Sequence, residues 1–476
     1  MLFNSFEFFA FLSIFLVCFF LLPRRTQPVV VLVASYIFYI GWRPAFALLL
    51  AFTTIVDYTT ALVMGATDRA ALRRAAMITA LTINLGILAT VKYLDFAISN
   101  VVGAAGFFGY DLPQYALSLV LPVGISFYTF QSVGYTLDVY HRRVPTESNL
   151  LTYAQYVAFF PQLVAGPIER AAHMLPQFRR AHLPRQENLS GLWLIAYGLF
   201  KKMCVADTLA PVVAGIYAHP GNFSGSYTLL ATIMFAIQIY CDFSGYSDIA
   251  RGVARLMDFE LMVNFRQPYF ATSLTEFWRR WHISLSSWFR DYLYVPLGGS
   301  REGERRAIRN IIIVFVLSGV WHGAAWAFVI WGALHGLGLA AERLWRNIVG
   351  DADGKNARCR SILGWMWTSV IVLTGWVFFR AGSLDNAIAV FATLRHFGPL
   401  DYGTFKTLGL ASFEILLLIL NLFILVAVDY YINFRPEQLH RLSERIYLPV
   451  VGGVALMYYI VLFGVFGRLD FIYFQF

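Results

Sequence analysis

Residues 310–341 read NIIIVFVLSGVWHGAAWAFVIWGALHGLGLAA, an apolar stretch that contains no Asp, Glu, Lys or Arg. His322 lies inside this stretch, within the run SGVWHG at 318–323. Apolar helices that cross a bilayer rarely carry ionisable side chains, and those that do usually use them for function. If a span begins near Ile311, His322 lies ~16 Å along a helix that rises ~1.5 Å per residue. That position is close to the middle of a hydrocarbon layer of ~30 Å.

The whole chain has the composition of a membrane protein. Of its 476 residues, 58% are hydrophobic and only 14% are charged, whereas soluble domains average ~25% charged residues. The first apolar block, Phe8–Leu22, has no basic segment before it and no small-residue cleavage site, so we expect an uncleaved span. The other blocks are Val29–Trp42, Pro44–Gly65, Ala75–Val91, Tyr115–Val133, Leu189–Tyr217, Tyr227–Cys241, Ile311–Leu334, Ile362–Phe379, Phe413–Val428 and Leu448–Phe466. We therefore predict an all-α polytopic membrane protein with one domain over residues 1–476.

The net charge of +9 is carried by short loops between the apolar blocks. Arginines gather at 24–25, 73–74, 142–143, 179–180 and 301–309, as the positive-inside bias predicts. This pattern indicates contact with anionic membrane lipid and argues against a nucleic-acid partner. The four cysteines form no CxxC pair and no metal-site spacing, so we expect no disulfide framework and no metal centre.

Residues 155–180 do not look like a simple span. Pro161, Pro167 and Pro176 interrupt them, and proline inside a helix breaks it. Irregular backbone at membrane depth persists only where protein covers it or where it lines a cavity. We predict a re-entrant or interfacial segment here.

Residues 273–296 predict an amphipathic helix at the membrane interface. Ser273 and Glu276 form a capping box that starts a helix. One face then carries apolar and aromatic residues at helical spacing, namely Trp278, Trp281, Leu285, Trp288 and Tyr292. The stretch 310–341 is too long for one crossing and too short for two. It is either one tilted helix or a helix broken near His322 and Gly323, and the sequence leaves both open.

His282 and His322 are the histidines best placed for chemistry. His335, between Gly332 and Gly336, is more typical of a histidine that packs helices together. No HExxH, GxSxG, Walker or GxGxxG motif indicates a zinc protease, a serine hydrolase or a nucleotide site. A buried imidazole stays neutral and accepts a proton from a hydroxyl, a contribution of ~10²–10⁴-fold. Acyl transfer from a thioester uses such a base, and a proton relay in a transporter is the alternative.

Several motifs, taken in chain order, resemble one known family. They are LPVGISFY (121–128), FPQLVAGP (160–167), DFSGYSD (242–248), NFRQPY (264–269), EFWRRWHISLS (276–286), RDYLY (290–294), WHGA (321–324) and FIYFQF (471–476). The chain resembles the membrane-bound O-acyltransferases, and is most similar to their bacterial alginate O-acetyltransferase branch. The resemblance implies about eleven transmembrane helices in a ring around a thinned centre, with re-entrant and interfacial helices. It also implies that His322 is the catalytic histidine and His282 the second histidine of the site.

The resemblance further implies the substrates. An acetyl group would pass from a cytoplasmic thioester, acetyl-CoA, across the bacterial inner membrane to an exopolysaccharide such as alginate. A periplasmic SGNH-type acetyltransferase is the expected partner, and no bound cofactor is expected. The related D-alanyl branch takes its acyl group from a carrier protein and serves teichoic acid, so it remains the alternative.

Other residues of these motifs are candidates for substrate binding. Arg279 and Arg280 are suited to donor phosphates, although interfacial anchoring explains them equally well. Trp281 and Trp321 flank the two histidines and are candidates for the acyl pocket, although packing is the default role of tryptophan. The resemblance also implies funnels that lead from both membrane faces to the catalytic histidine, and the candidates for their lining are Asn264, Gln267, Asp242, Ser244 and Tyr246.

Two functions of other classes remain open. A transporter or channel for the polymer or the donor would use the histidines as a gate. A scaffold would recruit the periplasmic enzyme and would retain polymer acetylation without His322.

Overall fold

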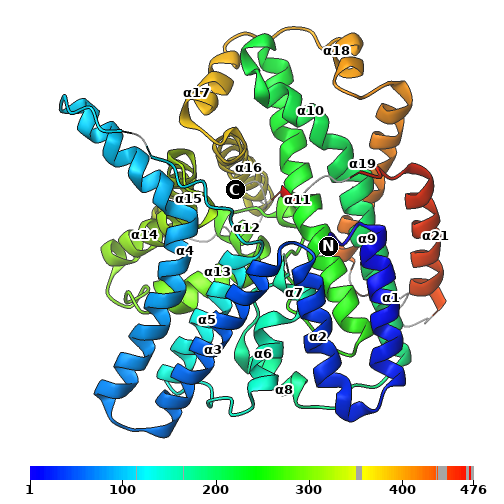
Figure 1. Ribbon diagram of the computed structural model, residues 1–476. Helices are drawn as coiled ribbons and strands as arrows, with labels where there is room; N and C mark the ends of the chain where they lie inside the picture. Colours follow the sequence, from blue (N-terminus) through cyan, green and yellow to red (C-terminus); the bar gives the residue numbers. More distant parts are fainter. Residues whose placement is uncertain are drawn as a thin grey trace. The chain divides into compact units, whose positions relative to one another are not determined.

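The computed structural model describes residues 1–113, 115–164, 166–349, 356–435, 437, 447–467 and 471–472 (Figure 1). Within these ranges the regular structure is helical and no strand occurs. The prediction of an all-α fold is confirmed. Of the motifs named above, Ala165 and residues 473–476 lie outside the described residues.

Five of the described helices are long and apolar enough to cross a membrane. They are α3 (Pro44–Ala66), α4 (Ala70–Phe107), α11 (Gly225–Leu256), α16 (Asn356–Ala381) and α19 (Ser412–Phe434). The apolar helix α1 (Phe6–Leu21) is shorter. The chain is a multi-pass membrane protein, and the count of eleven spans around a thinned centre stays a prediction.

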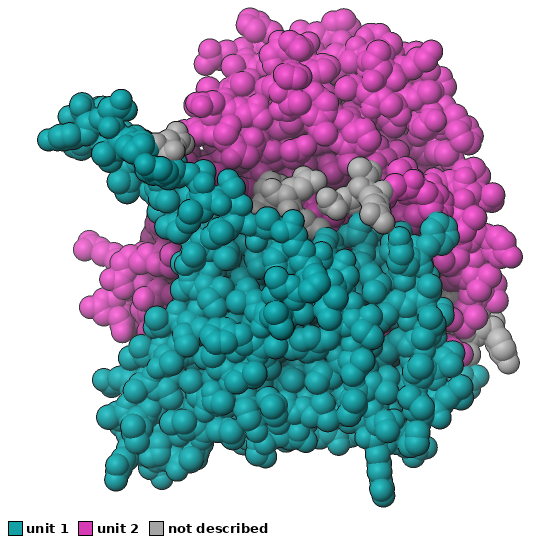
Figure 2. All heavy atoms as spheres, viewed as in Figure 1, with its two compact units in different colours: residues 1–188, 254–261 teal, residues 189–253, 262–476 magenta. Residues whose placement is uncertain are grey.

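The chain forms two compact units, which Figure 2 shows in different colours. Unit 1 consists of residues 1–188 and 254–261, and unit 2 consists of residues 189–253 and 262–476. That both units work as a single domain stays a prediction.

Unit 1 is built around a cluster of phenylalanines. The ring of Phe160 lies 5.3 Å from that of Phe11, 5.2 Å from that of Phe15 and 5.7 Å from that of Phe38, between ring centroids. Such aromatic contacts add to the free energy gained by burying the rings. The further elements of this part of the chain are η1 (Arg24–Thr26), α2 (Gln27–Ile40), α5 (Ile125–Tyr140), α6 (Leu150–Ala158), α7 (Phe160–Leu163), α8 (Ala171–Phe178) and η2 (Gln186–Leu189).

One predicted span of unit 1 is wrong in its first half. The sequence predicts a span over Tyr115–Val133, but α5 begins only at Ile125. Gly124 has a φ of +77°, and a Cβ atom there would lie 2.3 Å from the carbonyl oxygen of Leu163. The backbone of α7 therefore lies against Gly124, the residue through which α5 would have to extend toward Tyr115.

The irregular segment at 155–180 is confirmed. It consists of the end of α6, the single turn α7 and the short helix α8, with Pro161 in the first turn of α7 and Pro176 inside α8. Most of its described side chains are buried within the protein, as irregular backbone in a membrane protein requires.

Unit 2 holds both candidate histidines. Its helices α14 (Glu304–His322) and α15 (Trp326–Val349) lie side by side (Figure 1). The remaining elements of this part of the chain are α9 (Ser190–Leu199), the π-helical turn η3 (Phe200–Ala206), α10 (Asp207–Ala218), η4 (Pro220–Asn222), η5 (Pro268–Phe270), α12 (Leu274–Arg280), α13 (Ile283–Phe289), the π-helical turn η6 (Arg290–Tyr294), α17 (Leu384–Thr393), α18 (Tyr402–Thr407) and α21 (Tyr447–Phe463).

Candidate active site

His322 is the last residue of α14, and the helix breaks directly after it. Gly323 is extended, with φ −163° and ψ 153°, and α15 begins at Trp326. Of the two arrangements that the sequence leaves open for 310–341, the structure has the broken one. A Cβ atom on Gly323 would lie 2.1 Å from the ring of Phe328, so glycine is required where the chain turns back.

Glycines on both helices allow α14 and α15 to pack closely. A Cβ atom on Gly319 would lie 2.2 Å from the carbonyl oxygen of Phe328, and one on Gly332 would lie 2.2 Å from that of Phe315. Small residues at a helix crossing let two backbones approach each other. The end of α14, and with it His322, is therefore fixed against α15.

Aromatic rings surround His322, whose side chain is 4% exposed. The centroid of its ring lies 4.9 Å from that of Trp321, 4.9 Å from that of Trp331 and 5.3 Å from that of Phe379. All three contacts are edge to face. Such a site has little water, and electrostatic interactions in it are correspondingly strong.

His282 lies in a sharp turn, which corrects the prediction of one continuous helix over 273–296. Ser273 does cap α12, accepting a hydrogen bond from the Glu276 amide at 3.1 Å. The helix then stops at Arg280, and α13 starts only at Ile283. His282 between them is left-handed, with a φ of +44°, a conformation that is strained for residues other than glycine.

Asn264 holds this turn in place. Its side-chain oxygen accepts hydrogen bonds from the Ser284 amide at 3.1 Å and the Ser284 hydroxyl at 2.7 Å. Its carbonyl oxygen accepts from the Ile283 amide at 3.0 Å. The structure gives Asn264 the role of fixing the backbone beside His282, and its place in the lining of a funnel stays a prediction.

Trp321 connects the two candidate histidines. Its ring centroid lies 6.2 Å from that of His282 and 4.9 Å from that of His322. His282 is 1% exposed, and burial lowers its pKa to about 3, so its ring is neutral near pH 7. The motifs EFWRRWH and WHG, separate in sequence, thus meet at one indole.

His335 belongs to the same aromatic cluster, which the sequence did not indicate. Trp331 contacts both His335, at 5.0 Å, and His322, at 4.9 Å, between ring centroids. Trp278 lies 5.0 Å from His335 on its other side. The one available signal was the pair of glycines that flank His335, because they let neighbouring helices approach it.

The remaining candidates near His282 have different surroundings. Trp281 packs against the rings of Phe265 and Trp376, each at 5.0 Å. Arg280 is 2.6 Å from the Glu276 carboxylate and 2.6 Å from the Asn433 side-chain oxygen.

Arg279 and Gln267 complete this group. Arg279 is exposed, and no carboxylate of the described residues pairs with it. Gln267 is left-handed, with a φ of +43°, and its carbonyl oxygen accepts a 3.5 Å hydrogen bond from Arg280. Of the two arginines, Arg279 is therefore the one whose guanidinium has no competing carboxylate among the described residues.

Asp242, Ser244 and Tyr246 gather on α11 near a buried lysine. The Lys202 ammonium lies 2.8 Å from Asp242 and 2.8 Å from Asp207, and 5.8 Å from the centroid of the Tyr246 ring. Asp242 also accepts a 2.7 Å hydrogen bond from the Ile472 amide. Ser244 is buried on the same helix.

Phe243 links this region to the histidines. Phe243 follows Asp242 and precedes Ser244 in the sequence. The centroid of its ring lies 4.7 Å from that of His282. Asp242 thus pairs with Lys202 and with the Ile472 amide. The helix α11 contacts His282 through the ring of Phe243. Among the described residues no group of three His, Cys, Asp or Glu side chains is arranged to hold a metal ion.

Comparison with known proteins identifies the family. The family model described as MBOAT, membrane-bound O-acyltransferase, matches residues 141–382. The chain is 39% identical over 430 residues to the probable alginate O-acetylase AlgI of Azotobacter vinelandii, covering 90% of this chain and 84% of that protein. It is 35% identical over 386 residues to a peptidoglycan O-acetyltransferase of Helicobacter pylori, covering 75% and 71%.

A more distant relative is a teichoic acid D-alanyltransferase of Streptococcus thermophilus, 28% identical over 273 residues, covering 53% of this chain and 65% of that protein. The match to the family model contains both His282 and His322. With its apolar spanning helices and this similarity along most of its length, the chain belongs to the membrane-bound O-acyltransferase family and is a multi-pass membrane O-acyltransferase.

Proposed function

We propose that this O-acyltransferase moves an acetyl group from cytoplasmic acetyl-CoA across the bacterial inner membrane to hydroxyls of an extracytoplasmic polysaccharide, with His322 as the base. The acceptor receives the group directly or through a periplasmic SGNH-type acetyltransferase. The observation that carries the proposal is the meeting of His282 and His322 at Trp321. The similarity to an alginate O-acetylase and a peptidoglycan O-acetyltransferase supports acetyl as the group transferred.

The proposed step is a direct transfer. The His322 imidazole takes the proton of the acceptor hydroxyl, whose oxygen attacks the thioester carbonyl carbon. The carbon–sulfur bond then breaks, and the leaving thiolate receives the proton from the imidazolium. The products are an ester and free CoA, and no covalent enzyme intermediate is needed. Because His322 is surrounded by aromatic rings, little water competes with the acceptor hydroxyl.

The other candidates are assigned supporting roles in this proposal. His282, neutral and fixed by its turn, orients the reacting groups beside Trp321. Arg279 binds a donor phosphate through a charge-assisted hydrogen bond, because it is exposed and unpaired among the described residues. Trp281 and Trp321 bound the acyl group, and Asn264 and Gln267 shape the backbone around it.

The test is acetyl transfer by purified protein in proteoliposomes, given radiolabelled acetyl-CoA, the polysaccharide and the periplasmic partner. His322→Ala should lower the rate by at least ~10²-fold, the usual contribution of a general base. His219→Ala is the matched control, because His219 is exposed in the loop between α10 and η4 and should leave the rate unchanged. Transfer by His322→Ala at the wild-type rate would exclude His322 as the base.

The rival functions give different results in the same assay. D-alanyl transfer, to which the Streptococcus thermophilus relative points, requires a D-alanyl carrier protein as donor and gives no product from acetyl-CoA. A transporter moves polymer or donor without forming an ester. A scaffold supports polymer acetylation equally well with and without His322.

A further inference from the structure

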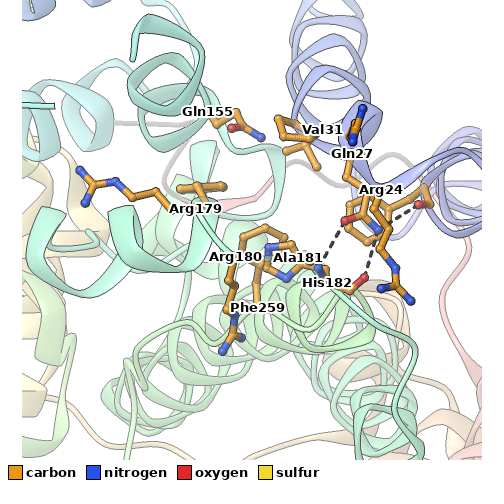
Figure 3. Close-up of a pocket in the computed structure, with 13 residues that line it drawn as sticks. Arg24, Gln27, Val31, Gln155, Arg179, Arg180, Ala181, His182 and Phe259 are labelled. Carbon is orange, nitrogen blue, oxygen red and sulfur yellow. Dashed lines mark hydrogen bonds between the residues drawn. The ribbon is translucent and has the colours of Figure 1, made fainter. Parts of the chain in front are cut away.

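Unit 1 contains a pocket far in sequence from the histidines of the proposed transfer. Its volume is about 240 Å³. It is lined by the end of α1, the turn η1, the start of α2 and the segment that follows α8, together with Phe259 (Figure 3). Pockets for drug-sized ligands have volumes of roughly 300–1,000 Å³, so this one suits a small group rather than a whole cofactor.

Arginines give the pocket an excess of positive charge. Arg24, Arg25, Arg179 and Arg180 all line it. Arg179 is neutralised by Glu147, with its nitrogens 2.6 and 3.0 Å from one carboxylate oxygen. No carboxylate of the described residues pairs with Arg24 or Arg25. The pocket therefore keeps two arginines available to an anion, and guanidinium groups match the geometry of phosphate oxygens.

A buried histidine completes the polar lining. His182 is 4% exposed and lines the pocket. Neither of its ring nitrogens makes a hydrogen bond of normal geometry with a described residue. Burial and the nearby Arg180 lower the pKa of His182 to about 4, so the ring is neutral near pH 7 and carries one N–H donor. Both ring nitrogens are enclosed by protein atoms, so His182 forms part of the pocket wall and the arginines supply the charged groups of the lining.

The pocket is held in shape by its own walls. The Gln27 amide donates to the His182 carbonyl at 3.1 Å and to the Phe19 carbonyl at 3.3 Å, and its oxygen accepts from the His182 amide at 3.3 Å. The His182 ring stacks on Phe259 at 3.9 Å between centroids. These contacts fasten α1, α2 and the segment after α8 to one another, so binding requires little ordering.

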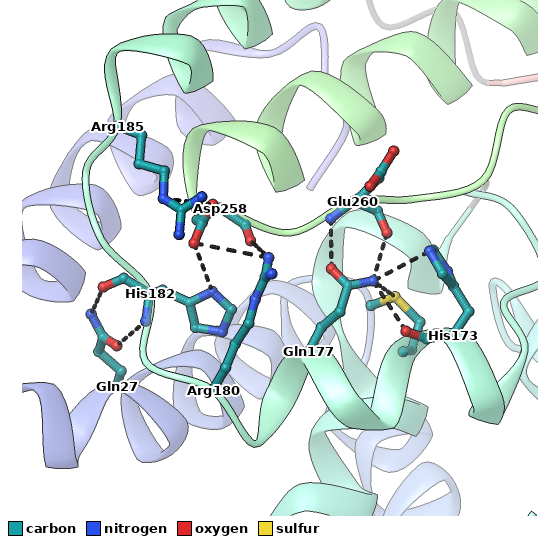
Figure 4. A network of polar contacts seen from close by, with 9 residues as sticks. Gln27, His173, Gln177, Arg180, His182, Arg185, Asp258 and Glu260 are labelled. Carbon is teal, nitrogen blue, oxygen red and sulfur yellow. Dashed lines mark hydrogen bonds and ion pairs between the residues drawn. The ribbon is translucent and has the colours of Figure 1, made fainter.

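One carboxylate lies near this histidine and does not cancel the positive charge. Asp258 is 3.9 Å from the His182 ring nitrogen, 3.9 Å from Arg180 and 3.8 Å from Arg185 (Figure 4). Its charge is therefore shared by two guanidinium groups, and Arg24 and Arg25 remain uncompensated.

The surroundings of Arg24 and Arg25 favour a lipid over a soluble ligand. On the adjoining helices Leu21 is 80% exposed, Val29 49% and Val33 51%. Exposed aliphatic side chains on helices of a membrane protein face acyl chains. A basic pocket between such helices matches the anionic headgroups of the cytoplasmic leaflet, the side on which short basic loops are expected.

We propose that this pocket binds the phosphate headgroup of an anionic membrane lipid, with Arg24 and Arg25 contacting the phosphate and the segment that carries His182 forming the opposite part of the lining. The lipid would tie α1 and α2 to the segment after α8. The site is independent of the acyl-transfer chemistry, so it stands whether or not His322 is the base.

The test is native mass spectrometry of the full chain in detergent, titrated with phosphatidylglycerol, with zwitterionic phosphatidylcholine or with inorganic phosphate. Phosphatidylglycerol should bind at least ~10-fold more tightly than phosphatidylcholine, and the double variant Arg24→Gln/Arg25→Gln should remove ~10-fold or more of that affinity. The matched control Arg301→Gln/Arg305→Gln removes the same charge from two exposed residues, one in the turn before α14 and one in its first helical turn, and should change the affinity less than about threefold.

A photoactivatable phosphatidylglycerol locates the site in the same preparation. Adducts on peptides that contain Phe19–Val31 or Phe178–His182 are expected. Adducts confined to other peptides, or equal losses of affinity in the two double variants, would overturn the proposal. Displacement of the lipid by millimolar inorganic phosphate, with no preference for phosphatidylglycerol, would identify the ligand as a soluble phosphate and overturn the assignment to lipid.

Discussion

His322 and His282 reach the same tryptophan by opposite structural means. His322 ends a regular helix, which close glycine contacts hold against α15. His282 lies in a left-handed turn between two short helices, and hydrogen bonds that Asn264 accepts from Ser284 hold this turn in place. One histidine depends on helix packing and the other on a small polar network. Substitutions that disturb packing and substitutions that disturb hydrogen bonds should therefore affect them differently.

The largest effect is expected where packing fixes His322. Gly319→Ala would place a Cβ atom 2.2 Å from the Phe328 carbonyl oxygen, so we expect a loss of ~1–3 kcal/mol in stability, as for other overpacked cores. The matched control is Gly86→Ala in α4, where a Cβ atom meets nothing within 4 Å. Because alanine favours helix by up to ~1 kcal/mol over glycine, this control should be neutral or stabilising. Thermal unfolding in detergent measures both, and equal melting temperatures would contradict the packing argument.

A stability effect of similar size is expected at the hydrogen bonds beside His282. Asn264→Ala removes the acceptor of the buried Ser284 amide, which costs ~1–3 kcal/mol. It should also lower acetyl transfer by about tenfold, because small displacements of a site residue are costly. Ser287→Ala, which removes a hydrogen bond to the Ser284 carbonyl, serves as the control and should retain most of the activity. Full activity of Asn264→Ala would show that other contacts hold the turn.

The pH dependence of stability tests the burial of His282. Its pKa is lowered from about 6.5 in the unfolded chain to about 3 in the folded one. Between pH ~6.5 and ~3 the imidazole of His282 is therefore protonated in the unfolded chain and neutral in the folded one. Each fall of one pH unit in this range lowers the free energy of unfolding by up to ~1.4 kcal/mol. Thermal unfolding of His282→Gln should lack this component. The same pH dependence in both proteins would mean that His282 is hydrated.

The smallest expected effect distinguishes the backbone conformation at His282 from that at His322. At the left-handed His282, glycine should give a more stable protein than alanine by ~1 kcal/mol, because only glycine adopts this conformation without strain. At His322, the last residue of α14 with helical backbone, alanine should be the more stable by up to ~0.5–1 kcal/mol. Thermal unfolding of the four variants, with glycine or alanine at position 282 or 322, measures this difference. The same order of stability at both positions would contradict a left-handed backbone at 282 and a helical one at 322.

The sequence predicted the parts of the fold that depend on local composition. The apolar blocks at Pro44–Gly65 and Phe413–Val428 lie within α3 and α19, and the prolines of the segment 155–180 indicated its irregularity. It also predicted His322 as a buried residue of an apolar helix. In each case the residues that form the sequence pattern are the same residues whose structure it predicts.

It failed where the cause lies elsewhere in the chain. The periodic aromatic residues from Trp278 to Tyr292 favour one helix, and the turn at His282 is held by Asn264, which belongs to another segment. Likewise, the break at Gly124 follows from the backbone of Leu163. Tertiary contacts override local propensity in both places.

The contact of the Trp321 indole with both histidines affects how the site responds to substitutions. Because its ring touches both histidines, a shift of one imidazole alters the surroundings of the other. Free-energy effects of neighbouring residues that share a partner are not additive. The free-energy cost of paired replacements at 282 and 322 should therefore differ from the sum of the costs of the two single ones.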